Sequence, residues 1–203
     1  MPVKLSIMRS AVAAVVVGVA AGKYNCPGSS SFSHASMEVT VDVDADCTSV
    51  QQEIEARASG SWVDPHNGGI YSVLSSSSGL INTQRTTNPA TSVGGNVYTD
   101  KQTFELTPTG GGCQIKGCSE SQGGSFSDFS TNYCDLRNLY CGSSDDCVTA
   151  GNDFTSREKS HSGSLGAGHD SSKCIVVAEV EAAKTGPPPV SELDLTKYVG
   201  LWY

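Results

Sequence analysis

Eight cysteines constrain the fold of this chain more than any other feature, because their number is even and all of them lie beyond residue 22. In an exported chain of this size, an even set of cysteines indicates a framework of up to four disulfides. Eight cysteines allow about a hundred pairings, so the sequence leaves the connectivity open. The candidate disulfide residues are Cys26, Cys47, Cys113, Cys118, Cys134, Cys141, Cys147 and Cys174.

A zinc site is the competing interpretation of these cysteines. Zinc ribbons and fingers use close Cys-x-x-Cys pairs, since two thiolates from one tight turn must reach the same ion. The cysteines nearest to one another here are separated by four, five or six residues, and no Cys-x-x-Cys pair occurs. The spacing therefore favours disulfides, and we expect no metal ion and no cofactor.

The N-terminus has the composition of an export signal. Lys4 and Arg9 supply positive charge, and residues 11–21 form an uninterrupted run of apolar and small residues. Because a bilayer span needs about 20 apolar residues, this run predicts a cleaved signal peptide over residues 1–22 and no stable membrane insertion. We therefore expect secretion through the secretory pathway. A bipartite plastid signal, which begins in the same way, is the minor alternative.

The charge of the chain argues against nucleic acid as a partner. The formal net charge is −8, and it becomes −10 without the first 22 residues, which carry two basic residues and no acidic one. Phosphate backbones and anionic lipid heads would repel such a body, and no basic stripe interrupts the surplus. The remaining length suits one modest domain with a hydrophobic core.

Runs of alternating residues predict antiparallel strands. Over residues 37–44, a methionine and three valines alternate with polar residues, which is typical of a half-buried strand. Strands are also expected over 70–75, 80–86 and 96–107, because turn signals separate these runs at the spacing of an antiparallel meander. Residues 174–181 are apolar enough to predict a final, central strand.

Two short helices complete the predicted α+β fold. Residues 47–58 predict the first helix, with Ser49 and Gln52 as a capping box. Apolar residues at helical spacing predict the second helix between Cys134 and Cys141, tied to the body by two disulfides.

The other segments indicate turns, irregular chain and a linker. Proline and Asn-Gly predict a tight turn over 61–69, and residues 142–173 are polar and expected to be irregular. We assign residues 23–183 to one disulfide-stabilised domain. A run of three prolines then indicates a semi-rigid linker over residues 184–190.

The final segment, residues 191–203, contains Asp194-Leu195, Lys197-Tyr198 and Gly200-Leu201-Trp202-Tyr203 in that order. This order resembles the N-terminal motif of lipocalins, in which a short helical turn leads into Gly-x-Trp. In that family the glycine permits close passage of the first barrel strand, and the tryptophan plugs the closed end of the barrel. The resemblance implies these structural roles for Gly200 and Trp202.

Residues 191–203 are too short to form a lipocalin domain. A closed, ligand-holding barrel needs about eight antiparallel strands, and the sequence given stops in the first. We therefore expect a truncated start of a lipocalin-like domain, in a fragment or an incomplete gene product. Violaxanthin de-epoxidases also place a cysteine-rich region before a lipocalin barrel, but with much denser cysteines, so the analogy is one of domain order. Residues 64–69 and 118–122 resemble segments of secreted algal proteins to which no activity is attached.

The four histidines do not specify a catalytic site. A serine next to a histidine in sequence seldom forms a nucleophile and base, and no Gly-x-Ser-x-Gly elbow occurs. His161 and His169 with Asp170 have metal-binding chemistry, but their glycine-rich surroundings are typical of a loop. The other two histidines are His34 and His66.

The acidic residues suggest solvated surfaces rather than sites. Asp42, Asp44 and Asp46 have the alternate spacing of a calcium loop but lack its glycine and distal glutamate, so a solvated strand end is expected. For Glu53 and Glu55 we expect the solvated face of a helix. Asp145-Asp146 is a further acidic pair that would attract Ca²⁺.

These observations favour a non-enzymatic function. The expected protein is a secreted binding or accessory module preceding a lipocalin-like carrier of small hydrophobic ligands, such a ligand being its partner in the full-length protein. The alternatives are a secreted enzyme, either a hydrolase or a redox-active lipocalin relative, and a structural cell-surface protein. No catalytic, cofactor-binding or metal-binding residue is assigned.

Overall fold

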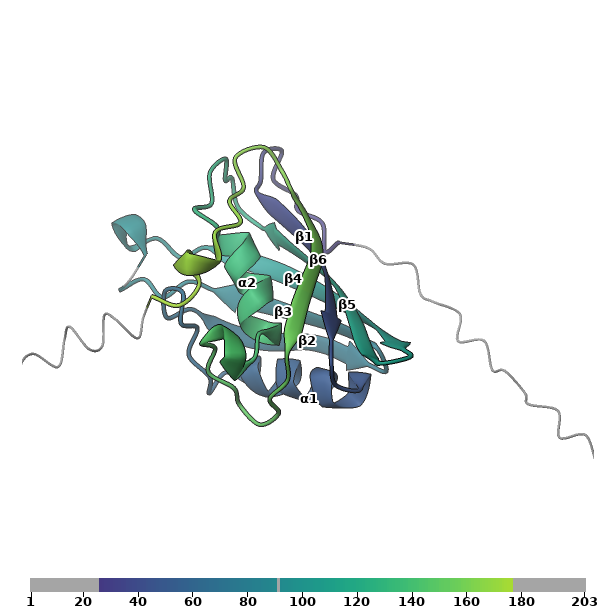
Figure 1. The fold of residues 1–203 in the computed structure, drawn as a ribbon. Coiled ribbons are helices and arrows are strands. Elements are labelled where there is room, and N and C mark those ends of the chain that lie inside the picture. The colour runs from purple at the N-terminus through teal and green to yellow at the C-terminus, as the bar shows by residue number, and fades with distance from the viewer. Residues whose placement is uncertain (1–25, 91, 177–203) are drawn as a thin grey trace, which may run out of the picture.

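The computed structural model describes residues 26–90 and 92–176, which fold around one open antiparallel sheet (Figure 1). The six strands lie in the order β2-β3-β4-β5-β1-β6. They are β1 (Ser36–Val43), β2 (Ile70–Ser77), β3 (Leu80–Thr86), β4 (Thr99–Thr109), β5 (Gly112–Ser121) and β6 (Ser156–Gly163). Together with two helices and four disulfides, this sheet confirms the predicted disulfide-stabilised α+β fold.

The two helices lie against the sheet and touch each other. Helix α2 (Thr131–Tyr140) packs against β1, β4 and β5, and helix α1 (Cys47–Arg57) contacts β4 and β5 near the lower end of the sheet in Figure 1. Three short 3-10 turns, η1 (Val93–Gly95), η2 (Ser143–Asp145) and η3 (Ser171–Lys173), lie in the connections. Within the described residues, no helix is both long and apolar enough to cross a membrane.

The apolar core lies between the inward face of the sheet and the helices. In β1, Met37 and the three valines are buried while their neighbours are not, as the alternating pattern predicts. A hydrophobic core of this kind is the main favourable contribution to folding. Its other large members include Ile54, Tyr71, Ile81, Phe104, Ile115, Leu136 and Leu139.

Strand β5 escaped prediction because Ile115 is the one large apolar side chain among its buried positions, and the others are cysteine, glycine and serine. Gly117 occupies one of them, and a Cβ there would lie 3.1 Å from Val39 Cγ2 and 3.2 Å from Leu136 Cδ2. The glycine therefore lets α2 approach the sheet closely, but it contributes nothing to an apolar pattern.

Strand β6 was not predicted, and the final strand predicted from the sequence is not observed in its described part. β6 is an edge strand with no buried residue, so neither apolar alternation nor hydrophobicity marks it. The prediction of irregular chain over 142–173 is therefore wrong for Ser156–Gly163. Of the strand predicted over 174–181, residues 174–176 are described and form no strand, and the remainder lies outside the described residues.

The N-cap of helix α1 differs from the prediction. The side chain of Asp46 accepts hydrogen bonds from the backbone N–H groups of Thr48 (2.9 Å) and Ser49 (3.0 Å), which makes it the N-cap. The predicted capping box of Ser49 and Gln52 is thus wrong. Hydrogen bonds from Ser49 lower the pKa of Asp46 from its ordinary value.

The sequence predicts a solvated helix face for Glu53, but its side chain is fully buried. That prediction is wrong. The Glu53 carboxylate accepts the backbone N–H groups of Ala150 (2.6 Å), Gly151 (2.8 Å) and Asn152 (2.6 Å). It also pairs with Arg57 Nε at 2.7 Å. Burial alone would raise the pKa of Glu53, but these hydrogen bonds lower it, so the carboxylate anchors the loop after η2 in its ionised form.

All eight cysteines pair, and none of those described is free. Two disulfides fasten segments to β5, one fastens η3 to α2, and one closes a short loop at the end of α2, so the second helix is tied by two disulfides as predicted. The pairs are Cys26–Cys118, Cys47–Cys113, Cys134–Cys174 and Cys141–Cys147. The predicted signal peptide, linker and lipocalin-like segment lie outside the described residues.

We expect the disulfides to stabilise the domain unequally. In the loop-entropy model, a bridge that spans 92 residues, as Cys26–Cys118 does, contributes about 4–5 kcal/mol, and one that spans six residues, as Cys141–Cys147 does, about 2 kcal/mol. Urea unfolding of the two double Cys→Ala variants would measure the difference. Equal losses, or a greater loss from the short bridge, would contradict it.

Candidate functional site

Three loops meet at the end of the sheet that is uppermost in Figure 1. They are residues 26–35, 122–130 and 164–170, and they lie together because β1 begins where β5 and β6 end. The backbone N–H of Ser125 donates to the carbonyl oxygen of Ser33 at 3.1 Å, which joins the first loop to the second. The third loop is joined to the second by hydrogen bonds described below.

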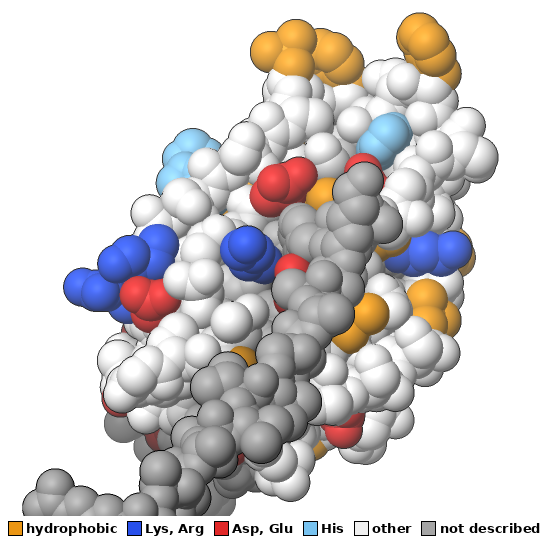
Figure 2. All heavy atoms as spheres, turned by 90° about the vertical axis from the view of Figure 1, so that its right-hand side faces the viewer, with side chains coloured by type: hydrophobic (Ala, Val, Ile, Leu, Met, Phe, Trp, Pro, Cys, Tyr) orange, Lys and Arg blue, Asp and Glu red, His pale blue; other side chains and the backbone are white. Residues whose placement is uncertain are grey.

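These loops carry large apolar side chains that are exposed to solvent. Phe32 is 106% exposed, Phe126 66%, Phe129 78% and Leu165 84%. We call these four residues the apical surface. Figure 2 shows hydrophobic side chains projecting at this upper end of the molecule. Exposed apolar groups that gather at one place on a domain are typical of interaction sites.

The backbone at Phe129 is held in an unfavourable conformation. Phe129 and Ser130 both have positive φ angles, +50° and +71°, in the region that non-glycine residues seldom adopt. The buried carboxylate of Asp128 holds this turn by accepting the N–H groups of Ser130 (3.1 Å), Asn132 (3.2 Å) and Gly168 (3.0 Å). Backbone conformations of this kind concentrate at functional sites.

The described residues also contain a buried charge cluster between the sheet and α2. The guanidinium of Arg85 lies 2.8 Å from Asp64 Oδ2, 3.1 Å from Asp135 Oδ1 and 3.5 Å from Asp100 Oδ2. All four side chains are almost completely buried. The predicted turn over 61–69 supplies Asp64, and it passes so close that a Cβ on Gly69 would lie 2.7 Å from Arg85 Nε.

One guanidinium faces three carboxyl groups, so they cannot all be ionised at low cost. Burial is the main reason that the pKa of Asp135 is raised well above its ordinary value, since Arg85 offsets only part of the effect. Burial likewise raises the pKa of Asp100. Of the carboxyl groups around Arg85, Asp135 is therefore the one whose protonated form the fold favours most strongly. Because the cluster lies inside the fold, we interpret it as structural.

This protonation predicts an unusual pH dependence for Asp135→Asn. Because the folded-state pKa of Asp135 is raised, its contribution to stability is complete below the unfolded pKa, about 4, and is lost as the pH rises through the folded-state pKa. The neutral amide avoids this loss. We therefore expect the unfolding free energy of the variant to improve relative to the natural protein between pH 4.5 and pH 8.

Urea titrations at the two pH values would test this expectation, with Asp46→Asn as the matched control. The pKa of Asp46 is lowered, so the stability it provides is present above its unfolded pKa and lost in acid. The control should consequently change little relative to the natural protein between pH 4.5 and pH 8, because its titration lies mainly below the unfolded pKa of about 4. An improvement of the control as large as that of Asp135→Asn would contradict the assignment.

A carboxylate and a histidine form a hydrogen-bonded pair on β6. A β-bulge between β1 and β6 places Glu158 and His161, three residues apart, on the same face of the sheet. His161 Nδ1 lies 2.6 Å from Glu158 Oε1, and the Tyr133 hydroxyl donates to the other carboxylate oxygen at 2.8 Å. The imidazole also stacks on His169, with ring centroids 4.2 Å apart.

Among residues 26–90 and 92–176, no serine or cysteine is hydrogen-bonded to the imidazole of this pair. Burial and the hydrogen bond to Glu158 raise the pKa of Tyr133 to about 12, which leaves the phenol a poor nucleophile at neutral pH. An open hollow of about 340 Å³ next to β6 is lined by His161 itself, together with Glu38, Val39, Thr40, Lys116, Ser160 and Ser162. Glu158 and Tyr133 are not among its lining residues, so the three hydrogen-bonded groups do not together face this hollow.

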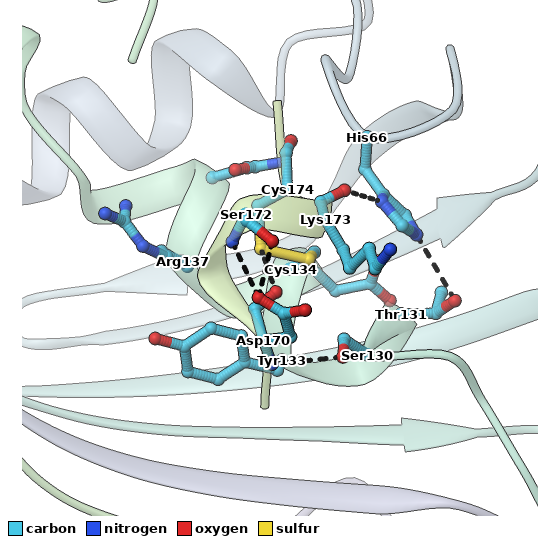
Figure 3. The surroundings of a disulfide bond; sticks show 12 residues. His66, Ser130, Thr131, Tyr133, Cys134, Arg137, Asp170, Ser172, Lys173 and Cys174 are labelled. Carbon is cyan, nitrogen blue, oxygen red and sulfur yellow. Dashed lines mark hydrogen bonds between the residues drawn. A yellow bond between two sulfur atoms is a disulfide. The ribbon is translucent and has the colours of Figure 1, made fainter. Parts of the chain in front are cut away.

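His66 has a structural role, which Figure 3 shows. Its Nδ1 lies 2.5 Å from the carbonyl oxygen of Lys173, and its Nε2 lies 3.4 Å from Thr131 Oγ1. Burial is the main reason that the pKa of His66 is lowered, although Asp64 opposes it. The neutral ring holds η3 against the start of α2, beside the Cys134–Cys174 disulfide.

The remaining candidate ligands are engaged separately. Asp42 lies 3.4 Å from Lys159 Nζ, Asp44 accepts the N–H of Thr155, and Asp46 caps α1, so the three carboxylates form no common site. Asp145 pairs with Arg137 at 3.4 Å, and His34 Nε2 lies 3.5 Å from Glu120. Over 26–90 and 92–176, the sole metal-like cluster joins Glu38 to Cys26 and Cys118, whose sulfurs are already bonded to each other.

Gly200 and Trp202, to which the lipocalin resemblance gives structural roles, lie outside the described residues. No sequence pattern predicted the apical surface. Three phenylalanines and a leucine in serine- and glycine-rich loops are a signal for it, but only the topology shows that the loops meet. A search with the sequence found no match among protein-family models or curated proteins.

Proposed function

We propose that this protein is a secreted, non-enzymatic binding module whose contact surface is the apical surface. The observation that carries the proposal is the display of Phe32, Phe126 and Leu165, each at least 66% exposed, from three loops at one end of the sheet. Disulfide-rich domains of this size are typical of oxidising, extracellular environments.

The proposed role is that of an accessory to a carrier of hydrophobic ligands. The resemblance of residues 191–203 to the start of a lipocalin supports it, because such carriers exchange apolar molecules with other apolar surfaces. A neighbouring domain with an exposed apolar end is suited to contact the same surroundings. Gly200 and Trp202 would then belong to the carrier, and the described domain would make the contact.

The hydrolase alternative has less support. The only observation in its favour is the Glu158–His161 pair, which lacks a serine or cysteine nucleophile hydrogen-bonded to the imidazole in the described part of the chain. The redox alternative has no free thiol there to act with, because all eight cysteines are paired.

Retention on a phenyl-substituted matrix would test the proposed contact surface. We expect the triple variant Phe32→Ser, Phe126→Ser and Leu165→Ser to elute well before the natural protein, because three projecting apolar groups are removed. The side chains point into solvent, so each replacement should change the unfolding free energy by about 0.5 kcal/mol or less.

The matched control removes three exposed apolar residues elsewhere, by Leu74→Ser, Leu80→Ser and Val148→Ser. These side chains are 51%, 38% and 61% exposed and belong to β2, β3 and the loop after η2. The control should elute close to the natural protein. If both triple variants elute equally early, the apical surface is not a distinct contact surface and the proposal fails.

A further inference from the structure

We propose that the apical surface docks reversibly on an electrically neutral lipid surface. This inference rests on the proposed function and names its partner: zwitterionic lipid headgroups with acyl chains beneath them. It requires only that loop side chains enter the headgroup region, which differs from spanning the bilayer with a helix.

The shape of the surface favours a soft partner over a small molecule. In Figure 2 the hydrophobic side chains at the upper end project as separate groups and line no hollow. Two surface hollows, lined around Glu38 and Lys116 and around Asp44 and Asp153, contain none of the four apical residues. Small-molecule sites are concave and bury most of their ligand, whereas a lipid surface deforms around projecting side chains.

The charge distribution favours neutral over anionic lipid. The loop tips, residues 27–33, 122–127 and 163–168, contain no charged residue and consist largely of serine and glycine. The chain as a whole carries a formal charge of −8. An anionic surface would repel such a protein. A zwitterionic surface has no net charge, so it does not repel the protein and binding to it requires no basic residues.

The three loops are already held in place before contact, so few residues need to become ordered on docking. The Cys26–Cys118 disulfide fastens the first loop to β5, and Asp128 joins the second loop to the third through Gly168. The third loop passes so close to the second that a Cβ on Gly166 would collide with the carbonyl oxygen of Phe126. A preorganised contact surface loses less conformational entropy on binding than a mobile one does.

Flotation of the secreted protein with phosphatidylcholine vesicles would test the inference. We expect the natural protein to float with these vesicles, and the triple variant Phe32→Ser, Phe126→Ser and Leu165→Ser to bind at least ten-fold more weakly. The control Leu74→Ser, Leu80→Ser and Val148→Ser should float like the natural protein. Vesicles that also contain phosphatidylglycerol should bind less protein, and added salt should reduce the difference.

Each contrary outcome has a distinct meaning. If the natural protein does not float with phosphatidylcholine, or if both triple variants float equally, the inference is wrong. Stronger flotation with anionic vesicles would also overturn it, since the charge argument would then have the wrong sign. The natural protein could instead form a dimer in sedimentation, fail to float with vesicles, and lose the dimer in the apical triple variant. That result would identify a second copy of the chain, and not lipid, as the partner.

The two proposals fail separately. If retention on the phenyl matrix depends on the apical residues but the protein does not bind vesicles, the lipid inference is wrong and the proposed binding module is still supported. If retention does not depend on these residues, the proposed function and the lipid inference are both wrong. Circular dichroism and non-reducing peptide mapping of the four disulfides would establish that every variant is folded before it is compared.

Discussion

The ion cluster around Arg85 joins parts of the domain that hydrophobic packing alone would leave free to slide. Its partners come from the turn before β2, from β4 and from α2, so one guanidinium fixes three elements on β3. Burial alone would lower the pKa of Arg85, but the carboxyl groups of Asp135 and Asp64 raise it, and the charge stays inside the fold. Dispersion forces have no such directionality, and a buried polar network can specify one arrangement of helix and sheet.

The position of α2 in turn determines the apical end. Asn132, Asp135 and Asn138 follow one another at three-residue intervals and are all fully buried, which forms a polar stripe along the helix. Asn132 is the first residue of this stripe. Its Nδ2 donates to Asp128 Oδ2 at 3.1 Å and to Ser121 Oγ at 3.0 Å. The loop that carries Phe126 and Phe129 is therefore attached to the same polar framework as the core, so its aromatic groups stay exposed instead of folding inward.

How much of this could be predicted from sequence depends on which signal each element carries. The valines of β1 alternate in an unmistakable way, and the cysteine spacing correctly favoured disulfides over zinc. Gly117 and the exposed β6 gave no such signal, because pattern analysis detects apolar burial and neither feature involves it. Burial of Glu53 depends on three N–H groups nearly a hundred residues away, which no local rule can supply. The apical surface was hidden for the same reason, since its loops are adjacent only in the folded sheet.

The two ends of the sheet are built for different tasks. At the lower end, α1 packs against β4 and β5, and the Glu53 carboxylate is held by three loop N–H groups and by Arg57. At the upper end, the Asp128 carboxylate holds the loops in the same way, but Phe32 and Leu165 are 106% and 84% exposed within the described part of the chain. Water disfavours that exposure, and the adjacent left-handed turn at Phe129 adds strain, so the domain retains an arrangement that folding alone does not require. Contact with an apolar surface would relieve the first of these costs, which is why we infer function from this end of the domain.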